Sequence, residues 1–321
     1  MNLHPDPQRR LRILTRHVHG NYLWYLSQVP HDWFLVTDAE RSPHHGGRSG
    51  TLPWGPNVHE VAQDAVKHER FDVVLFQSRR EWLEEQHVVL SAEQRRLPRI
   101  YLEHDPPQQH PTDTLHWMDD PSVLLVHVTA FNALMWNSGS VPTRVIEHGV
   151  KLLAEAAYSG ERPSGLVVVN NIARRGRRLG LDVYAQVARQ VPLSLIGMNS
   201  VDAGGEGEVP NAELPARMAA HRFFFNPIRY TSLGLAVIEA MMVGTPVVAL
   251  ATTELVSVID DGRNGLIDTR VPRLVDGMRH LLADPQEARR LGEAGRRTAL
   301  ERFGIERFVA DWMAALRAVT G

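Results

Sequence analysis

Short apolar runs alternate with longer amphipathic stretches along the first half of this chain. The apolar runs have the length and side chains of buried strands, and they lie at residues 11–14, 33–36, 71–76, 99–102, 123–128 and 144–146. Between some of them, apolar residues recur at helical spacing, as in residues 58–67 and 79–96. Strands that alternate with helices are typical of a parallel sheet covered by helices on both faces.

A polar segment at residues 151–165 interrupts this alternation, and a second alternating set follows it. We therefore predict an N-terminal domain at residues 1–150 and a C-terminal domain at residues 151–321. The second set predicts strands at residues 166–169, 193–196, 223–225 and 247–250, with helices at 181–189, 212–220 and 233–243. Residues 271–319 are almost wholly helical in pattern, and the last helix is a candidate to pack back on the N-terminal domain. The predicted fold class is α/β, with two doubly wound, Rossmann-like domains.

Length and composition narrow the class of protein. A chain of 321 residues exceeds what one hydrophobic core usually holds, and 43% hydrophobic residues are enough for two cores. No apolar run approaches the roughly 20 residues that cross a bilayer, and the first residues lack the apolar stretch of a signal peptide. We therefore expect a cytoplasmic protein with no transmembrane segment, for which peripheral membrane contact stays open. The net charge of −2 gives no overall attraction for nucleic acid, and the absence of cysteine excludes thiolate metal sites.

The most informative segment, residues 226–249, reads as the end of a strand, a loop and a helix that starts near Ser232. Backbone N–H groups at such a helix start, together with the helix dipole, bind anions. Gly234 lets a ligand approach the backbone closely, and the carboxylate of Glu239, further along the helix, can accept hydrogen bonds from sugar hydroxyls. The alternative is a capped core helix with a structural glutamate, and spacing alone does not separate the two.

This segment resembles the donor-site signature of retaining glycosyltransferases of family 4, which have the GT-B fold of two domains facing across a cleft. The matching residues, in order, are Gly234-Leu235, Glu239-Ala240-Met241 and Gly244-Thr245-Pro246-Val247-Val248. The resemblance implies that Glu239 binds the ribose of a nucleotide. It also implies that Ser232, Leu233 and Gly234 offer backbone N–H groups to the donor.

The signature also departs from the family in two places. Thr231, which we keep as a donor-site residue, stands where the family has the first glutamate of the signature. In the family that glutamate faces the transferred sugar. A later family element loses its glycines and its closing glutamate, because residues 253–257 read Thr-Glu-Leu-Val-Ser. Both changes fall where the donor sugar would lie, so they bear on the sugar and on activity itself.

A second cluster places four arginines on a glycine-containing loop between a strand and a helix, at residues 170–180. The guanidinium group binds phosphate oxygens in pairs, so this loop is a candidate clamp for a diphosphate. The family has basic residues on the diphosphate in this region. That implies catalytic, charge-stabilising roles for Arg174 and Arg178, and donor contacts for Asn171 and Arg175. The alternatives are a solvated basic loop or an RNA-binding patch.

Two loops that follow strands of the N-terminal domain carry the remaining candidates. His104-Asp105 follows the run at residues 99–102, and family members have a histidine near the transferred sugar at a similar place. We predict a catalytic role for His104 and an acceptor-side position for Asp105, since imidazole can relay a proton near neutral pH. After the first strand, the resemblance implies that Gly20 lies beside the donor phosphates, with His19 and Asn21 on the acceptor side.

A metal site is the rival interpretation of His17-Val18-His19, because the same His-x-His pattern opens amidohydrolase barrels. Such a barrel needs eight similar β/α units and further metal ligands after later strands. The signature around Glu239 does not fit that fold. We therefore predict that the protein has no metal site.

These observations predict an enzyme, a hexosyltransferase-like glycosyltransferase that needs no metal or other cofactor. It would move a sugar from a nucleotide diphosphate to a hydroxyl of a glycan, lipid-linked or small-molecule acceptor, with retention of anomeric configuration. A non-catalytic relative that binds a nucleotide or a glycan is the alternative that Thr231 favours. Nucleotide-sugar epimerisation is a third interpretation and RNA binding a fourth.

Overall fold

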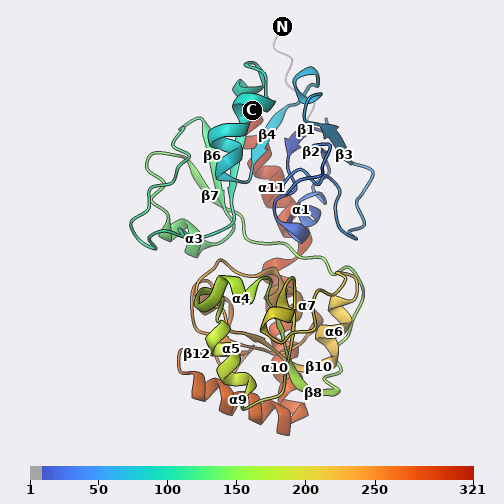
Figure 1. Ribbon diagram of the computed structural model, residues 1–321, viewed down its shortest axis with the longest axis vertical. Coiled ribbons are helices and arrows are strands. Elements are labelled where there is room, and N and C mark those ends of the chain that lie inside the picture. The colour runs from blue at the N-terminus through green and yellow to red at the C-terminus, as the bar shows by residue number, and fades with distance from the viewer. Residues whose placement is uncertain (1–8) are drawn as a thin grey trace. The chain divides into compact units, whose positions relative to one another are not determined.

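The computed structural model describes residues 9–321, and its contacts divide the chain into two units (Figure 1). The first unit runs to Glu147 and also takes Phe308–Gly321 from the end of the chain. The second unit is His148–Arg307. In residues 9–321 no helix is both long enough and apolar enough to span a membrane.

The first unit is built on a sheet of seven strands, all paired in parallel, in the order β3-β2-β1-β4-β5-β6-β7. The strands are β1 (Arg12–Thr15), β2 (Asp32–Thr37), β3 (Val58–Ala62), β4 (Val73–Phe76), β5 (Arg99–Glu103), β6 (Val123–His127) and β7 (Thr143–Val145). The central strand β4 is buried along its whole length, because helices and loops cover both faces of the sheet. The order of the strands reverses between β1 and β4, and ligands of doubly wound sheets bind beside such a point, at the carboxyl ends of the strands.

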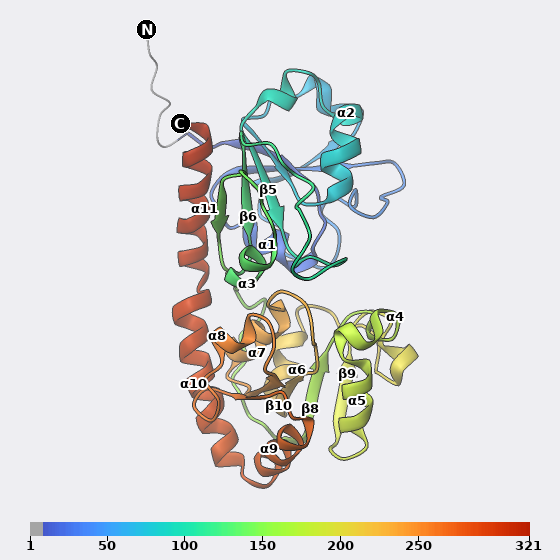
Figure 2. The ribbon, with the colours of Figure 1, turned by 90° about the vertical axis from the view of Figure 1, so that its left-hand side faces the viewer.

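The helices of the first unit are short. They are α1 (Gly20–Leu26), a π-helix η2 (Glu81–Glu85) that continues as α2 (Gln86–Val89), α3 (Ala130–Met135), and the 3₁₀ turns η1 (Val66–His68) and η3 (Gln94–Arg96). The C-terminal helix α11 (Ile305–Thr320) lies along this unit's sheet in Figure 2, and its Phe308 packs edge-on against Tyr22 at 5.7 Å between ring centroids.

Two predicted helices of this unit differ from the structure. The helix predicted at residues 58–67 is wrong, because Val58–Ala62 forms β3, paired in parallel with β2. Val58 and Val61 show helical spacing, but pairing at the sheet edge prevails for these β-branched side chains. The helix predicted at residues 79–96 is broken after Val89, where Leu90 takes an extended conformation.

The second unit has five parallel strands in the order β12-β11-β10-β8-β9. The strands are β8 (Arg162–Val168), β9 (Leu193–Ile196), β10 (His221–Asn226), β11 (Val247–Leu250) and β12 (Leu266–Asp268). The helices are α4 (Ile172–Arg175), α5 (Leu181–Ala188), α6 (Leu214–Ala220), α7 (Leu235–Val243), α8 (Leu255–Val258), α9 (Val271–Ala283) and α10 (Pro285–Phe303), with 3₁₀ turns η4 (Gly176–Leu179) and η5 (Ser200–Ala203).

The core of the second unit lies between its sheet and the helices α5, α9 and α10. Phe223 and Phe225 of β10 and Met278 of α9 are fully buried in it. The boundary segment predicted at residues 151–165 proved too long, because β8 already begins at Arg162. The α/β class, with one parallel sheet in each of two units, is confirmed.

Candidate functional site

Two loops meet at the carboxyl edge of the second unit's sheet, because β8 and β10 are neighbouring strands. The first loop runs from β8 to α5 and holds the arginine cluster, and the second runs from β10 to α7. The backbone N–H groups of Arg229 and Tyr230 donate to the carbonyl of Arg178 at 3.0 and 3.3 Å. Gly180 has φ +79°, and a Cβ there would lie 2.0 Å from the carbonyl oxygen of Pro227. Only glycine fits this close approach, so the two predicted donor segments are held together.

The four arginines of the cluster differ in their partners. Arg177 pairs with Asp182 at 2.6 Å, and Arg229 binds the same carboxylate with two nitrogens, at 2.6 and 2.8 Å. The hydrogen bond from Arg229 is the main reason why the pKa of Asp182 lies below its usual value. Within residues 9–321, Arg174, Arg175 and Arg178 have no carboxylate partner, and Arg174 is exposed to solvent.

Asn171 lies at the start of the arginine cluster, in the left-handed backbone conformation with φ +55°. Its N–H donates to the carbonyl of Met198 at 2.7 Å, and its Oδ1 accepts a hydrogen bond from Asn199 at 2.8 Å. Asparagine tolerates this conformation better than most residues do. The turn at Asn171 thus sets the direction in which the arginine loop leaves β8.

The helix that carries Glu239 begins at Leu235, so its predicted start near Ser232 is wrong. Ser232 and Leu233 belong to the preceding loop and Gly234 is the N-cap, with nothing within 4 Å of a Cβ placed there. Within the described part of the chain, the backbone N–H groups of Leu233 and Gly234 donate no hydrogen bond. These N–H groups at the helix start provide the local requirement for anion binding.

Glu239 is the fifth residue of α7, a helix whose other buried residues are all apolar, and it is 5% exposed. A carboxylate is rarely found so deep in an apolar helix unless it has polar partners. Thr231, in the loop before the helix, is half-buried. The roles predicted for both residues stay predictions.

The loop after β11 joins this edge and was not among the predicted site residues. The hydroxyl of Thr252 donates to the carbonyl of Ile228 at 3.1 Å, which ties this loop to the loop after β10. Glu254 is 3% exposed and pairs with Arg302 of α10 at 3.0 Å. The resemblance had placed residues 253–257 of this loop where the donor sugar would lie, without naming a site residue among them.

In the first unit, His104 follows β5 at the carboxyl edge of the sheet and is 8% exposed. Its ring lies 3.9 Å from the ring of His19 and 4.7 Å from that of Tyr22, measured between centroids. His19 precedes α1, which begins at Gly20 and continues with Asn21. The structure thus brings together His19 and His104, the histidines of the two predicted loops. Gly20 has an open surrounding, because a Cβ placed there would meet nothing within 4 Å.

The turn His104-Asp105 is held by buried side chains. Asn132 and Trp136, from and after α3, donate to the carbonyls of His104 and Asp105 at 3.1 and 2.8 Å. The N–H of Asp105 donates to Glu103 at 2.9 Å, and His116 lies 3.1 Å from the other oxygen of that carboxylate. Burial raises the pKa of Glu103 above its usual value. This support fixes where His104 points.

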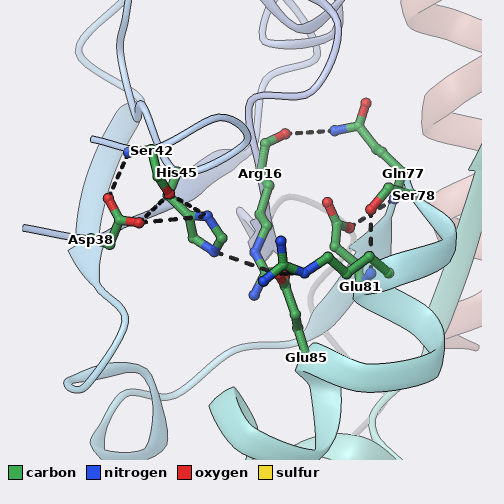
Figure 3. A network of polar contacts seen from close by, with 9 residues as sticks. Arg16, Asp38, Ser42, His45, Gln77, Ser78, Glu81 and Glu85 are labelled. Atoms are coloured by element: carbon green, nitrogen blue, oxygen red, sulfur yellow. Dashed lines mark hydrogen bonds and ion pairs between the residues drawn. The ribbon is translucent and has the colours of Figure 1, made fainter. Parts of the chain in front are cut away.

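A polar network that the sequence did not predict occupies the same edge, as Figure 3 shows. Arg16, which follows β1, is buried and forms an ion pair with Glu85 of the π-helix. His45 lies 3.8 Å both from Glu85 and from Asp38, the residue after β2. Burial is also the main reason why the pKa of Glu81 is raised. Contacts between residues so far apart in sequence have no local signal.

The rival metal site can be examined in the same loops. His17 makes hydrogen-bond contacts with the carbonyl of Gly47 and the hydroxyl of Ser49, both at 2.9 Å. Across residues 9–321 there is no group of three or more histidine, aspartate or glutamate side chains arranged to bind a metal ion.

Part of the chain is similar in sequence to known proteins. Residues 206–298 match the family model described as glycosyl transferases group 1. Alpha-maltose-1-phosphate synthase of Mycolicibacterium smegmatis is 32% identical over 120 residues, which cover 35% of this chain and 31% of that protein. The GDP-mannose-dependent alpha-(1-6)-phosphatidylinositol monomannoside mannosyltransferase of the same organism is 28% identical over 171 residues, 45% of each chain. The chain thus aligns with less than half the length of these curated relatives.

Solved structures resemble the chain over nearly its whole length. Sucrose-phosphate synthase from Thermosynechococcus elongatus has a TM-score of 0.69 at 16% identity, covering 97% of this chain and 99% of that one. HepE of Anabaena, solved in complex with UDP, has a TM-score of 0.66 at 15% identity, covering 97% and 100%. The protein therefore has the GT-B fold. Residues 206–298, which contain α7 and Glu239, match the glycosyl transferases group 1 family model, and the resemblance predicted from the sequence is confirmed.

Proposed function

We propose that the protein is a glycosyltransferase that transfers a sugar from a nucleotide diphosphate donor to a hydroxyl acceptor. One observation carries the proposal: Arg174 and Arg178, which lack carboxylate partners within residues 9–321, lie on a loop packed against the loop that leads into α7. Guanidinium groups and helix N–H groups that converge on one edge suit a diphosphate. That HepE was solved with UDP, and that the matched mannosyltransferase is named as GDP-mannose-dependent, supports a nucleoside diphosphate as the ligand.

In this proposal the second unit does the work on the leaving group. The bond between the sugar and the diphosphate breaks while Arg174, Arg178 and the N–H groups at Leu233 and Gly234 stabilise the negative charge that develops. Asn171 and Arg175 contact the donor, and Glu239 binds the ribose hydroxyls. Because arginines and the helix dipole supply the positive charge, the proposed reaction needs no metal ion.

The first unit is proposed to bind the acceptor. His104 accepts a hydrogen bond from a reacting hydroxyl, while His19, Asn21 and Asp105 contact the acceptor and Gly20 leaves room for the donor phosphates. The acceptor hydroxyl attacks the face that the diphosphate leaves, so that the anomeric configuration is retained, and its proton, relayed by His104, ends on the departing phosphate. The proposed acceptor is a glycan, a lipid-linked molecule or a small molecule.

A second candidate is a non-catalytic relative that binds a nucleotide or a glycan. The observation that favours it is Thr231, whose hydroxyl cannot supply the negative charge of the glutamate that the family has there. Such a protein would keep the arginine loop and Glu239 for binding while lacking turnover.

One experiment separates the two candidates. The protein is incubated with UDP-, GDP-, ADP- and TDP-sugars, and both the shift in melting temperature and the slow release of free sugar are measured. A glycosyltransferase is stabilised by its donor and hydrolyses it, since water replaces the acceptor, whereas a non-catalytic binder is only stabilised. Stabilisation and hydrolysis should both be lost on Arg174→Ala with Arg178→Ala and kept in the control Arg177→Ala, whose guanidinium is already paired with Asp182. Absence of any stabilisation in the wild type would contradict both the glycosyltransferase and a relative that binds a nucleotide.

A further inference from the structure

The side chain of Gln77 joins three strands of the first unit at their carboxyl ends. Gln77 directly follows β4 and is 5% exposed. Its Nε2 donates to the hydroxyl of Thr15, in β1, at 2.9 Å and to the carbonyl of Arg16 at 2.8 Å. Its Oε1 lies 3.0 Å from Nε2 of His104, which follows β5. The contact between Gln77 and Arg16 is visible in Figure 3.

These contacts fix which way the amide of Gln77 points. A backbone carbonyl such as that of Arg16 can only accept a hydrogen bond, so the group that faces it must be the NH₂ of the amide. Both N–H bonds of that NH₂ are then used, one on Arg16 and one on Thr15. A flipped amide would place its oxygen against the carbonyl oxygen of Arg16. The atom that faces His104 is therefore the carbonyl oxygen of Gln77, which accepts.

The orientation of the amide also determines the proton of His104. Because Oε1 of Gln77 can only accept, Nε2 of His104 must carry the hydrogen that lies between them. A neutral imidazole has one N–H, so Nδ1 is left with a lone pair. We propose that Gln77 is a positioning residue that fixes neutral His104 as the Nε2–H tautomer, which makes Nδ1 the hydrogen-bond acceptor of the ring.

Neighbouring contacts keep both partners in place. The backbone N–H of Gln77 donates to Glu81 at 2.9 Å, and Arg16, whose carbonyl receives the amide, is anchored by its ion pair with Glu85. On the other side, the carbonyl of His104 accepts a hydrogen bond from Asn132 at 3.1 Å. Neither the amide nor the imidazole can turn without breaking a buried hydrogen bond, so one tautomer of His104 is favoured over the other.

The tautomer is measured directly by NMR, without any assay of activity. The full chain is labelled with ¹⁵N-histidine, its two ring nitrogens are followed by long-range ¹H–¹⁵N correlation at neutral pH, and the signals of His104 are identified by their loss in His104→Ala. We expect a protonated Nε2 and an unprotonated Nδ1 in the wild type, and a mixture of tautomers in Gln77→Met. A wild-type His104 protonated on Nδ1, or a mixture, would overturn the proposal, even if Gln77→Met did not fold.

A kinetic test follows the role of Nδ1, which rests on the proposed function. Gln77→Met should lower kcat by roughly tenfold while leaving KM for the donor within about twofold, because the lost effect lies on the reacting hydroxyl. In a His104→Ala background the same change should cost nothing further, since Gln77 acts through His104. A second loss of similar size in that background would overturn the proposal.

Gln94→Met is the matched control. Gln94 is 6% exposed and its Nε2 also donates twice to backbone carbonyls, those of Val66 and Glu69, at 2.7 and 2.9 Å. It does not contact His104 and should leave kcat and the tautomer unchanged. If no donor supports turnover, the proposed function fails, and the NMR result alone decides the role of Gln77.

Discussion

The carboxyl edges of the two sheets carry polar side chains in opposite electrostatic arrangements. In the first unit the charges are paired and the basic partners are buried: Arg16 with Glu85, and His45 near Glu85 and Asp38. In the second unit, within residues 9–321, Arg174, Arg175 and Arg178 have no carboxylate partner. A surface that keeps cations unpaired at a helix start is suited to an anion, whereas a paired edge is suited to neutral hydroxyl groups.

The difference extends to how each edge is supported. The first unit holds His104 through side-chain hydrogen bonds from Gln77 and Asn132. The second unit relies on backbone, through the approach of Gly180 to Pro227 and the bonds to the carbonyl of Arg178. Substitutions in the second unit should therefore affect nucleotide affinity or the fit of the two loops, while those in the first should affect protonation.

The largest effect is expected from removing the unpaired cations. Each charge-assisted hydrogen bond contributes roughly 1.5–3 kcal/mol, so Arg174→Ala with Arg178→Ala should weaken binding of the preferred nucleoside diphosphate by about 100-fold or more. Isothermal titration calorimetry measures the change. Arg177→Ala is the control and should alter affinity by less than about twofold, because its guanidinium is paired with Asp182. Equal losses in both variants would mean that pairing does not distinguish the arginines.

The close contact between the two loops predicts the next largest effect, on stability. Gly180→Ala places a Cβ against the carbonyl of Pro227 in addition to a left-handed backbone, and should lower the free energy of unfolding by about 3 kcal/mol. Gly204 has nearly the same φ and ψ, +78° and 20°, but an open surrounding, so Gly204→Ala should cost only about 1 kcal/mol. Urea unfolding compares the two, and equal costs would show that the approach to Pro227 is not tight.

A smaller effect is expected at Glu239. Glu239→Gln keeps the side-chain volume and removes the charge, so it should weaken nucleotide binding by roughly tenfold, the strength of one hydrogen bond to a charged group. If that carboxylate binds ribose, the variant and the wild type should bind a 2′- or 3′-deoxynucleotide with equal affinity. Calorimetry with the paired ligands gives the coupling directly. If the wild type still bound both deoxynucleotides about tenfold more tightly than Glu239→Gln does, a contact between Glu239 and the ribose would be excluded.

Local sequence patterns were sufficient for the fold class because they depend on neighbours along the chain. The alternation of apolar runs located both sheets, and the glycine after Val243 marked the end of α7. Patterns failed where long-range pairing decides. Val58 and Val61 have helical spacing, yet pairing with β2 makes a strand of them, and β8 starts within the polar segment predicted to be a boundary.

The candidate site shows the same limit. The sequence favoured Arg174 and Arg178 within the arginine loop, but it did not show that Arg177 pairs with Asp182, whose carboxylate Arg229 also binds. Gln77 follows a predicted strand, but nothing local marks its role, since its partners Thr15, Arg16 and His104 lie on or directly after other strands. A place after a strand can be predicted from the sequence, whereas the role of a residue that orients another is defined by contacts.

The smallest effects are expected from titration, and they should have opposite signs at Glu103 of the first unit and Asp182 of the second. The pKa of Glu103 is raised, chiefly by burial, so the folded state binds its proton more readily than the unfolded state does. Its contribution to stability therefore increases as the pH falls through the raised pKa toward the unfolded value of about 4.3. The pKa of Asp182 is lowered, chiefly by Arg229, so its contribution is present above the unfolded value of about 3.9 and is lost at lower pH.

Urea unfolding between pH 7 and pH 3 tests this contrast by the difference between the wild type and each variant. Acidification should narrow the stability advantage of wild type over Asp182→Asn, because the folded carboxylate is then protonated. Acidification should also raise the free energy of unfolding of the wild type relative to that of Glu103→Gln, because only the wild type gains a proton on folding. Since Asp182 is partly exposed, added salt should weaken its effect more than that of buried Glu103. Slopes of the same sign would mean that the two edges do not differ in how they hold their carboxylates.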